Sequence, residues 1–265
     1  MRDESTDDVP TVNSSKLKPE EDLGLLGMLE DSNIKTTLFV CGITARLFPD
    51  RLKELAKSGF EIAAHGYRHE NFQLLNRLEQ KRRIGLSLNL LKECVGREVL
   101  GWRSPGLHAS TSFYRLLEDS NVQYCSNVEL PLCFKHVPFR YCHKVELPIG
   151  IIDLKLYQSR LSPAKVRRRL LSTLSQRHEI VNVVIHPWVQ LQDAERVRVL
   201  KDFLEAAESM DGVTFSSGSE VCQQSLLRGI SPYDATLSVF ANVWKRVSRR
   251  MQGPSSKVQA ILGHA

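Results

Sequence analysis

The sequence predicts an α/β fold built on parallel strands, and three observations support that class. Short apolar or alternating runs recur between segments of helical periodicity, which is the pattern of strands joined by crossover helices. The length of 265 residues suits one barrel-sized domain. The composition, 42% hydrophobic and 25% charged, is that of a globular protein. These features leave two architectures open, an open α/β sheet or a β/α barrel.

Each element is predicted from its own pattern. Eight runs are predicted as strands, at residues 36–41, 60–64, 99–102, 122–125, 144–149, 151–157, 180–185 and 213–215. Six segments between them have helical periodicity, at residues 19–31, 49–58, 77–95, 110–119, 163–176 and 193–209. Pro19 precedes three acidic residues that suit the positive end of a helix dipole, and Pro49 opens a helix that Gly59 closes.

Composition also sets expectations about the compartment. No run of 18 or more apolar residues occurs, and no apolar stretch follows Met1 and Arg2, so neither a spanning helix nor a secretory signal is predicted. The six cysteines include no C-x-x-C pair, which favours reduced thiols. We therefore expect a cytoplasmic protein.

The net charge of +6 is concentrated in the last 41 residues. From Ser225 onward there are six basic residues and one acid, so the rest of the chain carries only +1 and nucleic acid is not an expected partner. A basic amphipathic helix is predicted in this tail, where apolar residues recur at three- and four-residue steps: Leu237, Phe240, Trp244, Val247 and Met251. Such a helix either packs against the main domain or lies peripherally on an anionic membrane.

Polar side chains follow three of the predicted strands. His65 comes directly after residues 60–64, Arg103 after 99–102, and His186 after 180–185. In parallel α/β folds the carboxyl ends of the strands form the rim where chemistry is done. We therefore expect these three side chains to share one mouth.

Several of these residues have a specific chemistry and an ordinary alternative. His65 and His69, four residues apart around Gly66, could chelate one divalent metal, or they are two surface histidines. Arg103 precedes a turn predicted at Pro105 and Gly106, which would hold its backbone in place. It could bind a carboxylate through two hydrogen bonds, or it is a surface arginine.

Two further candidates lie near the ends of the domain. His186, locked by Pro187, could donate a proton, or it is a half-buried structural histidine. Asp7 and Asp8 could divide labour, one as metal ligand and one as base, or they are solvated acids near a terminus.

Taken in order, the segments STDDVP, HGYRH, RSPG and VVIHP resemble the motif series of the polysaccharide deacetylase, or NodB-homology, family of carbohydrate esterases. The likeness covers about residues 5–220. It implies a distorted (β/α) barrel with about seven strands, which removes N-acetyl or related N-acyl groups from sugars with one divalent metal. On this basis we divide the chain into a deacetylase domain, residues 1–222, and a basic tail, residues 223–265.

The resemblance also assigns roles to residues. STDDVP matches the family's T-F-D-D-G-P, so Asp7 would be the general base and Asp8 a metal ligand beside His65 and His69. Arg103 would orient Asp7, and His186 would be the general acid. Zinc is the expected metal, since two imidazoles and a carboxylate suit it, although cobalt, nickel or iron could occupy the same set.

The sequence departs from the family pattern in two places. The fourth motif, an Asp near a Trp that tunes the catalytic histidine, has no clear match, and Cys125 stands about where the acid is expected. The apolar strand that should precede STDDVP is also missing, so either the sequence as given starts late or the barrel lacks its first strand.

Two functions follow from these observations. The preferred prediction is a metal-dependent N-deacetylase acting on an amino sugar or glycan, with a nucleotide-linked or lipid-linked sugar favoured over a wall polymer because no secretion signal is visible. The alternative is a catalytically silent member of the same fold that binds glycan or acts as a scaffold.

Overall fold

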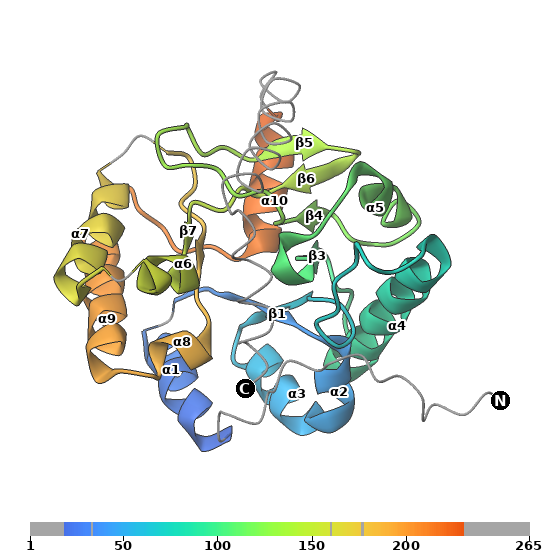
Figure 1. The fold of residues 1–265 in the computed structure, drawn as a ribbon, viewed down its shortest axis with the longest axis horizontal. Helices are drawn as coiled ribbons and strands as arrows, with labels where there is room; N and C mark the ends of the chain where they lie inside the picture. The colour runs from blue at the N-terminus through green and yellow to red at the C-terminus, as the bar shows by residue number, and fades with distance from the viewer. Residues whose placement is uncertain (1–18, 33, 160, 176–177, 231–265) are drawn as a thin grey trace.

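The computed structural model describes residues 19–32, 34–159, 161–175 and 178–230. Within these residues eight strands lie among ten α-helices (Figure 1). The strands are β1 (Thr37–Val40), β2 (Glu61–Ala64), β3 (Gly101–Trp102), β4 (Tyr124–Cys125), β5 (Phe139–Tyr141), β6 (Lys144–Glu146), β7 (Ile151–Ile152) and β8 (Val183–Val184). The helices are α1 (Pro19–Asp31), α2 (Gly42–Leu47), α3 (Pro49–Lys57), α4 (Arg77–Val95), α5 (Thr111–Leu116), α6 (Asp153–Gln158), α7 (Pro163–Leu174), α8 (Pro187–Gln190), α9 (Ala194–Glu208) and α10 (Gly218–Arg228).

The strands form a six-stranded sheet, in the order β1-β2-β3-β4-β6-β5, and a two-stranded sheet of β7 and β8. Every pairing is parallel except that of the hairpin β5–β6. A parallel bridge between Glu129 and Ile149 continues the pairing on the path from β4 toward β7. Crossover helices explain this arrangement, because parallel neighbours need a long connection between them. The predicted α/β barrel-like fold with about seven parallel strands is confirmed.

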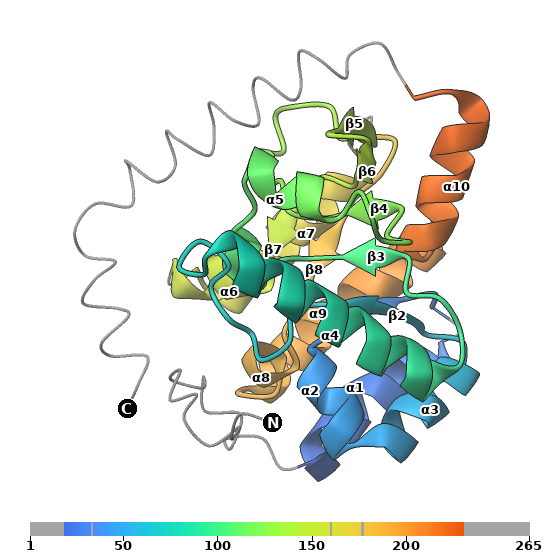
Figure 2. The ribbon, with the colours of Figure 1, turned by 90° about the vertical axis from the view of Figure 1, so that its right-hand side faces the viewer.

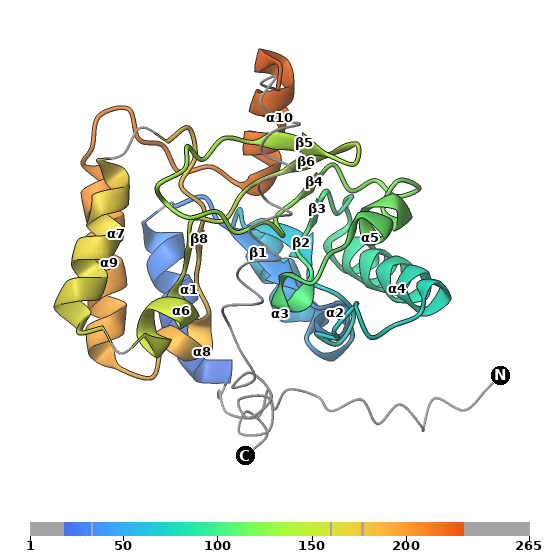
Figure 3. The ribbon, with the colours of Figure 1, turned by 45° about the horizontal axis from the view of Figure 1, so that its top comes forward.

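Two groups of helices cover the strands on opposite sides (Figure 3). On one side α2 to α5 pack on the strands β1 to β4 around a core that includes Trp102, Phe113 and Leu91. On the other side α1, α6, α7 and α9 enclose a second apolar cluster that includes Val166 and Phe203. The site described below lies where these two halves meet.

Helix α10 closes the amino-terminal end of the strands, opposite the end from which α6 and α8 start (Figure 2). Its amino terminus contacts Tyr124, whose hydroxyl donates to the Glu61 carboxylate at 2.9 Å. A Cβ atom added to Gly101 or Gly218 would lie 2.2 or 2.4 Å from that hydroxyl. Both positions must therefore be glycine for the phenol to fit, and Tyr124 seals this end of the barrel.

The element predictions succeed where long periodicity is present and fail at short elements. Helices α1 and α4 have the predicted limits. Residues 213–215 form no strand, because the chain there is a connection into α10, and the strand predicted at residues 151–157 stops at Ile152, where α6 begins. The strand β5 was not predicted, since it is a three-residue hairpin partner of β6.

The remaining sequence predictions concern the tail, the two aspartates, the domain boundary, the cysteines and membrane-spanning helices. The predicted helix of the tail and the residues Asp7 and Asp8 lie outside them. Helix α10 runs across the boundary predicted between residues 222 and 223. None of the six cysteines, all of which lie among the described residues, forms a disulfide. Among the described residues, no helix has the length and apolar character to cross a membrane.

Candidate active site

The three residues that follow strands meet at one mouth, at the carboxyl ends of the strands. His65 follows β2, Arg103 follows β3, and the His65 Nδ1 atom lies 2.8 Å from the Arg103 carbonyl oxygen. His186 follows β8 and is close enough to His65 for its charge to lower the pKa of that imidazole. The structure therefore brings His65, His69, Arg103 and His186 together, as the sequence predicted.

His65 and His69 form an imidazole pair. Their ring centroids are 4.9 Å apart at an interplanar angle of 70°. Burial and the neighbouring His69 lower the pKa of His65 to about 3, and burial also lowers the pKa of His69. Both rings are therefore neutral near pH 7, which is the form that binds a metal. Because the Arg103 carbonyl oxygen accepts a hydrogen bond from Nδ1–H of His65, Nε2 is the ring nitrogen that could bind a metal.

The loop that carries these histidines is held in an unusual conformation. Gly66 and His69 both have positive φ, 75° and 61°. The buried Glu70 carboxylate fixes the turn by accepting from the backbone N–H groups of Tyr67 and Arg68, at 3.0 and 2.6 Å. A Cβ at position 66 would lie 3.1 Å from both Glu70 and Pro105. Glycine is needed here for both its φ and its size.

Tyr67 anchors the same loop from behind. Its ring lies below the guanidinium groups of Arg68 and Arg83, at 5.5 and 5.4 Å from the ring centroid. Its hydroxyl accepts from Arg46 at 3.3 Å. Glu79 pairs with Arg83 at 2.6 Å and thereby holds that guanidinium over the ring. Cation–π contacts and an ion pair thus support the loop that carries His65 and His69.

Cys41, directly after β1, also touches the histidine loop. Its thiol donates to the His65 carbonyl oxygen at 3.3 Å. Burial and the charge of Glu70 raise the pKa of Cys41 to about 12. The thiol is therefore protonated near pH 7 and acts as a hydrogen-bond donor to the loop.

Arg103 is a buried cation without a carboxylate partner among the described residues. Its side chain donates to the Ser126 carbonyl oxygen at 3.2 Å and to the Ser126 hydroxyl at 2.8 Å. The guanidinium carbon lies 3.9 Å from the centroid of Phe39. Burial lowers the pKa of Arg103 to about 10, so the group still carries its charge near pH 7. A buried charge of this kind calls for an anion at the mouth.

Asp153 is a candidate site residue that the sequence analysis did not name. It stands at the end of β7, is 2% exposed, and lies 2.6 Å from His186, between Oδ1 and Nδ1. Its carboxylate also accepts from the backbone N–H groups of His186 and Leu154, at 2.7 and 2.6 Å. Asp153 therefore stands against His186 in the way that the resemblance leads us to expect of the acid of the fourth motif. Cys125, the position expected for that acid, is buried within β4.

A signal for Asp153 does exist in the sequence. The rule that found His65, Arg103 and His186, a polar residue directly after an apolar run, also applies to Ile151, Ile152 and Asp153. The alternation of apolar residues continues through Leu154 and Leu156, so the pattern predicts a strand that runs to Tyr157. Helix α6 begins at Asp153, so its apolar residues continue those of the strand and the sequence shows no break between the two elements.

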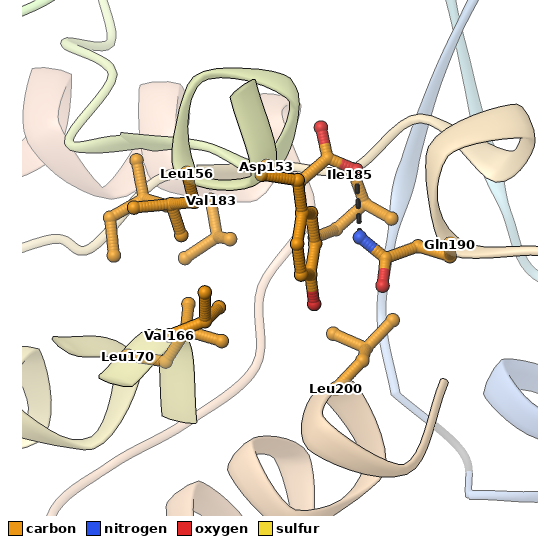
Figure 4. A pocket seen from close by; sticks show the side chains of 10 residues that line it. Asp153, Leu156, Val166, Leu170, Val183, Ile185, Gln190 and Leu200 are labelled. Atoms are coloured by element: carbon orange, nitrogen blue, oxygen red, sulfur yellow. Dashed lines mark hydrogen bonds between the residues drawn. The ribbon is translucent and has the colours of Figure 1, made fainter. Parts of the chain in front are cut away.

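Gln190 of α8 completes the polar cluster. Its Nε2 donates to Asp153 Oδ2 at 2.8 Å, while its Oε1 atom is buried without a hydrogen-bond partner among the described residues. Figure 4 shows Asp153 and Gln190 facing each other at the edge of a cavity whose other side chains are mostly aliphatic. The amide and the two backbone N–H groups keep the carboxylate aimed at His186.

Two of the three predicted metal ligands, His65 and His69, lie among the described residues. The described residues contain no group of three metal-ligating side chains, and the third predicted ligand, Asp8, lies outside them. The two that are described fit the role, because His65 and His69 are neutral, adjacent, and offer at least one ring nitrogen free of the backbone. An imidazole pair with one carboxylate is a typical set for a catalytic divalent metal.

Comparisons with known proteins point to the family suggested by the motifs. The model of the polysaccharide deacetylase family matches residues 7–125, beginning at the first of the two aspartates. This segment carries His65, His69 and Arg103, so the resemblance predicted from the sequence is confirmed.

Individual proteins are similar to this chain in sequence or in fold. The bifunctional xylanase/deacetylase of Pseudobutyrivibrio xylanivorans is 22% identical over 91% of this chain and 32% of its own length. A Mycobacterium smegmatis protein classed among the polysaccharide deacetylases is similar in structure, with a TM-score of 0.68, 24% identity, and 80% and 79% of the two chains covered. A pseudoenzyme of carbohydrate esterase family 4 from Bacillus anthracis is similar with a TM-score of 0.54, 14% identity, and 77% and 60% covered. The chain spans between about a quarter and a third of the length of the curated relatives it matches.

Proposed function

We propose that this protein is a metal-dependent hydrolase that removes an N-acetyl group from an amino sugar of a glycan. One observation carries the proposal. A histidine held by a buried carboxylate, His186 with Asp153, stands at the same mouth as a pair of neutral histidines, His65 and His69. The first arrangement suits proton transfer and the second suits metal binding.

In this proposal His65, His69 and Asp8 hold one divalent metal, for which zinc is the first candidate and cobalt, nickel or iron are alternatives. When bound, this metal would supply a Lewis acid, which would polarise the amide carbonyl and acidify water in the site. Asp7 takes the proton from the attacking water. The buried Arg103 guanidinium, which has no carboxylate partner among the described residues, supports this role, because a carboxylate at its side would neutralise the charge and be oriented by it.

His186 acts as the general acid. Attack by the water oxygen on the carbonyl carbon makes a new C–O bond, and the C–N bond then breaks. The imidazolium of His186 gives its proton to the departing nitrogen, so the products are acetate and a free amino sugar. Asp153 fixes the ring through Nδ1 and stabilises the protonated form by its negative charge, as a buried carboxylate does beside a catalytic histidine.

The proposed substrate class is an N-acetylated glycan. The family model and the relative named as a xylanase/deacetylase support it. The expectation of a nucleotide-linked or lipid-linked sugar, the contact of the tail with a membrane and the cytoplasmic compartment stay predictions. A catalytically silent member is the rival function, and the similarity to a family 4 pseudoenzyme is the observation that keeps it open.

Acetate release and metal content, measured together, test the proposal. The purified chain should bind one equivalent of zinc and release acetate from N-acetylglucosamine oligomers. Asp8→Asn should weaken zinc binding, whereas Asp7→Asn should keep the zinc and lose most turnover, because an amide cannot accept the proton. Full activity of an Asp7→Ala/Asp8→Ala variant would show that these aspartates are not the base and ligand. Zinc binding without acetate release would favour the silent member.

A further inference from the structure

The turn that follows the catalytic histidine is fixed from several sides. Helix α8 is a single turn with His186 at its amino-terminal cap and Pro187 at its first position. Val189 and Gln190 are buried, and Gln190 is hydrogen-bonded to Asp153. Arg196 of α9 donates to the Val189 carbonyl oxygen at 2.7 Å. The backbone of this turn is therefore rigidly placed at the edge of the mouth.

Trp188 is the residue that this rigid turn leaves open to solvent. Its side chain is 44% exposed, although tryptophan is the largest apolar residue and normally loses most of its surface in a fold. Its ring centroid lies 5.7 Å from that of His186, at an interplanar angle of 59°. The other described tryptophan, Trp102, is fully buried in the core. An apolar ring face thus stands beside the imidazole proposed to meet the leaving nitrogen.

We propose that Trp188 is a platform on which a sugar ring of the substrate stacks. The inference rests on the proposed function for its substrate class, because a glycan whose N-acetyl group reaches His186 must place neighbouring atoms of its chain close to the Trp188 ring. Pyranose rings present a face of C–H groups, and these pack on the electron-rich face of an indole. Burial of the exposed indole adds a hydrophobic contribution. Trp188 is therefore a specificity residue that holds the sugar and takes no part in proton transfer.

Binding and turnover of tri-N-acetylchitotriose by the full chain test this role. The variants are Trp188→Ala, which removes the ring, and Trp188→Phe, which keeps an aromatic face. Leu227→Ala is the matched control, since Leu227 is 81% exposed on α10, at the far end of the strands. Titration calorimetry gives the Kd, and acetate release gives kcat and KM.

We expect Trp188→Ala to raise the Kd and the KM about tenfold while kcat changes little. Trp188→Phe should recover most of the affinity, and Leu227→Ala should bind as the parent chain does. Equal affinity of Trp188→Ala and the parent chain overturns the platform, and so does a parent chain that does not bind the trisaccharide. An equal loss of affinity in both Trp188 variants also overturns it, since an aromatic face would then not be the feature that binds.

The same measurements separate this inference from the proposed function. If the parent chain binds the trisaccharide through Trp188 but releases no acetate, the platform stands and the catalytic proposal fails. If the parent chain releases acetate and Trp188→Ala keeps the parent KM, the catalytic proposal stands and the platform fails.

Discussion

His65 and His186 stand at the same end of the strands, each just past a short parallel strand, yet their Nδ1 atoms face different partners. Nδ1 of His65 lies 2.8 Å from a backbone carbonyl oxygen, that of Arg103. Nδ1 of His186 lies 2.6 Å from a carboxylate, that of Asp153. A carbonyl oxygen fixes the neutral tautomer, whereas a carboxylate also stabilises the charged ring.

The comparison shows how the surroundings of one side-chain type can differ within one site. On the half formed by β1 to β4, burial lowers the pKa of both imidazoles, and the neighbouring His69 lowers the pKa of His65 further. On the half formed by β7 and β8, the His186 ring has a carboxylate partner at Nδ1 instead. In the proposed function we expect this difference in the partner of Nδ1 to separate the metal ligands from the general acid.

Removal of both imidazoles on the first half should have the largest effect. We expect His65→Ala/His69→Ala to lose the metal and to lower activity by at least about a thousandfold, because neither the polarised carbonyl nor the acidified water remains. Elemental analysis and acetate release measure the two effects. His143→Ala, at an exposed position in the β5–β6 hairpin, serves as the control. A full equivalent of metal in the double variant would mean that these histidines are not the ligands.

Asp153→Asn tests the second half of the comparison. The amide cannot stabilise a charged His186 ring, so we expect kcat to fall about a hundredfold with the metal content unchanged. The combination with His186→Ala should cost little more than His186→Ala alone, since the two residues act as a unit. Additive losses in this cycle would show that Asp153 acts on something other than His186.

Arg103→Met asks whether the buried cation between the two halves has an anionic partner. If Asp7 pairs with Arg103 in the metal-loaded protein, the substitution should lower the free energy of unfolding by about 3 kcal/mol. Denaturant titration of the metal-loaded protein measures this, and addition of Asp7→Ala should then cost little more. An Arg103→Met variant as stable as the parent chain would contradict the pair, because a lone buried charge is replaced at no cost.

We expect the smallest effect from Glu79→Gln. This substitution removes the charge that holds Arg83 over the ring of Tyr67, in the loop that carries His65 and His69. Hydrogen bonds from Arg82 and Arg83 hold the pKa of Glu79 at about 2, below its ordinary value of 4.5. The ionised carboxylate therefore adds stability above about pH 4.5, and this contribution is lost as the pH falls toward 2. Because the pair is partly exposed, we expect Glu79→Gln to cost only about 0.5–1 kcal/mol at pH 7.

The pH dependence provides the check. Thermal or denaturant unfolding should show the difference between Glu79→Gln and the parent chain shrinking between pH 4.5 and pH 2. Glu54→Gln, which removes a more exposed ion pair with Arg51, should change stability little at any pH. A difference for Glu79→Gln that stays constant down to pH 2 would mean that charge is not what Glu79 contributes.

The part of this fold that sequence reasoning could reach is the part with long periodicity. Helix α4 shows its limits through its 19 residues, its Asn76 cap and the left-handed Gly96 that ends it. His65, Arg103 and His186 could be found because each follows an apolar run. The mouth they share follows from parallel pairing, so their proximity was predictable as well.

The rest could not be reached because it depends on partners far away in the sequence. The strand β7 has two residues and exists because it pairs with β8, about 30 residues later, so local alternation cannot show where it stops. The role of Asp153 depends on that stop, and the burial of Gln190 depends on Asp153. No feature of the sequence distinguishes Trp188, because the exposure of its ring is visible only in the packed structure.

The closed end of the molecule has a consequence for library design. The hydroxyl of Tyr124 occupies the space that a side chain at Gly101 or Gly218 would need, and it is bonded to Glu61. These four positions therefore depend on one another, and they lie at the opposite end of the strands from His65 and His186. Randomised libraries aimed at new substrates can therefore keep these four positions constant and vary the loops at the carboxyl ends of the strands.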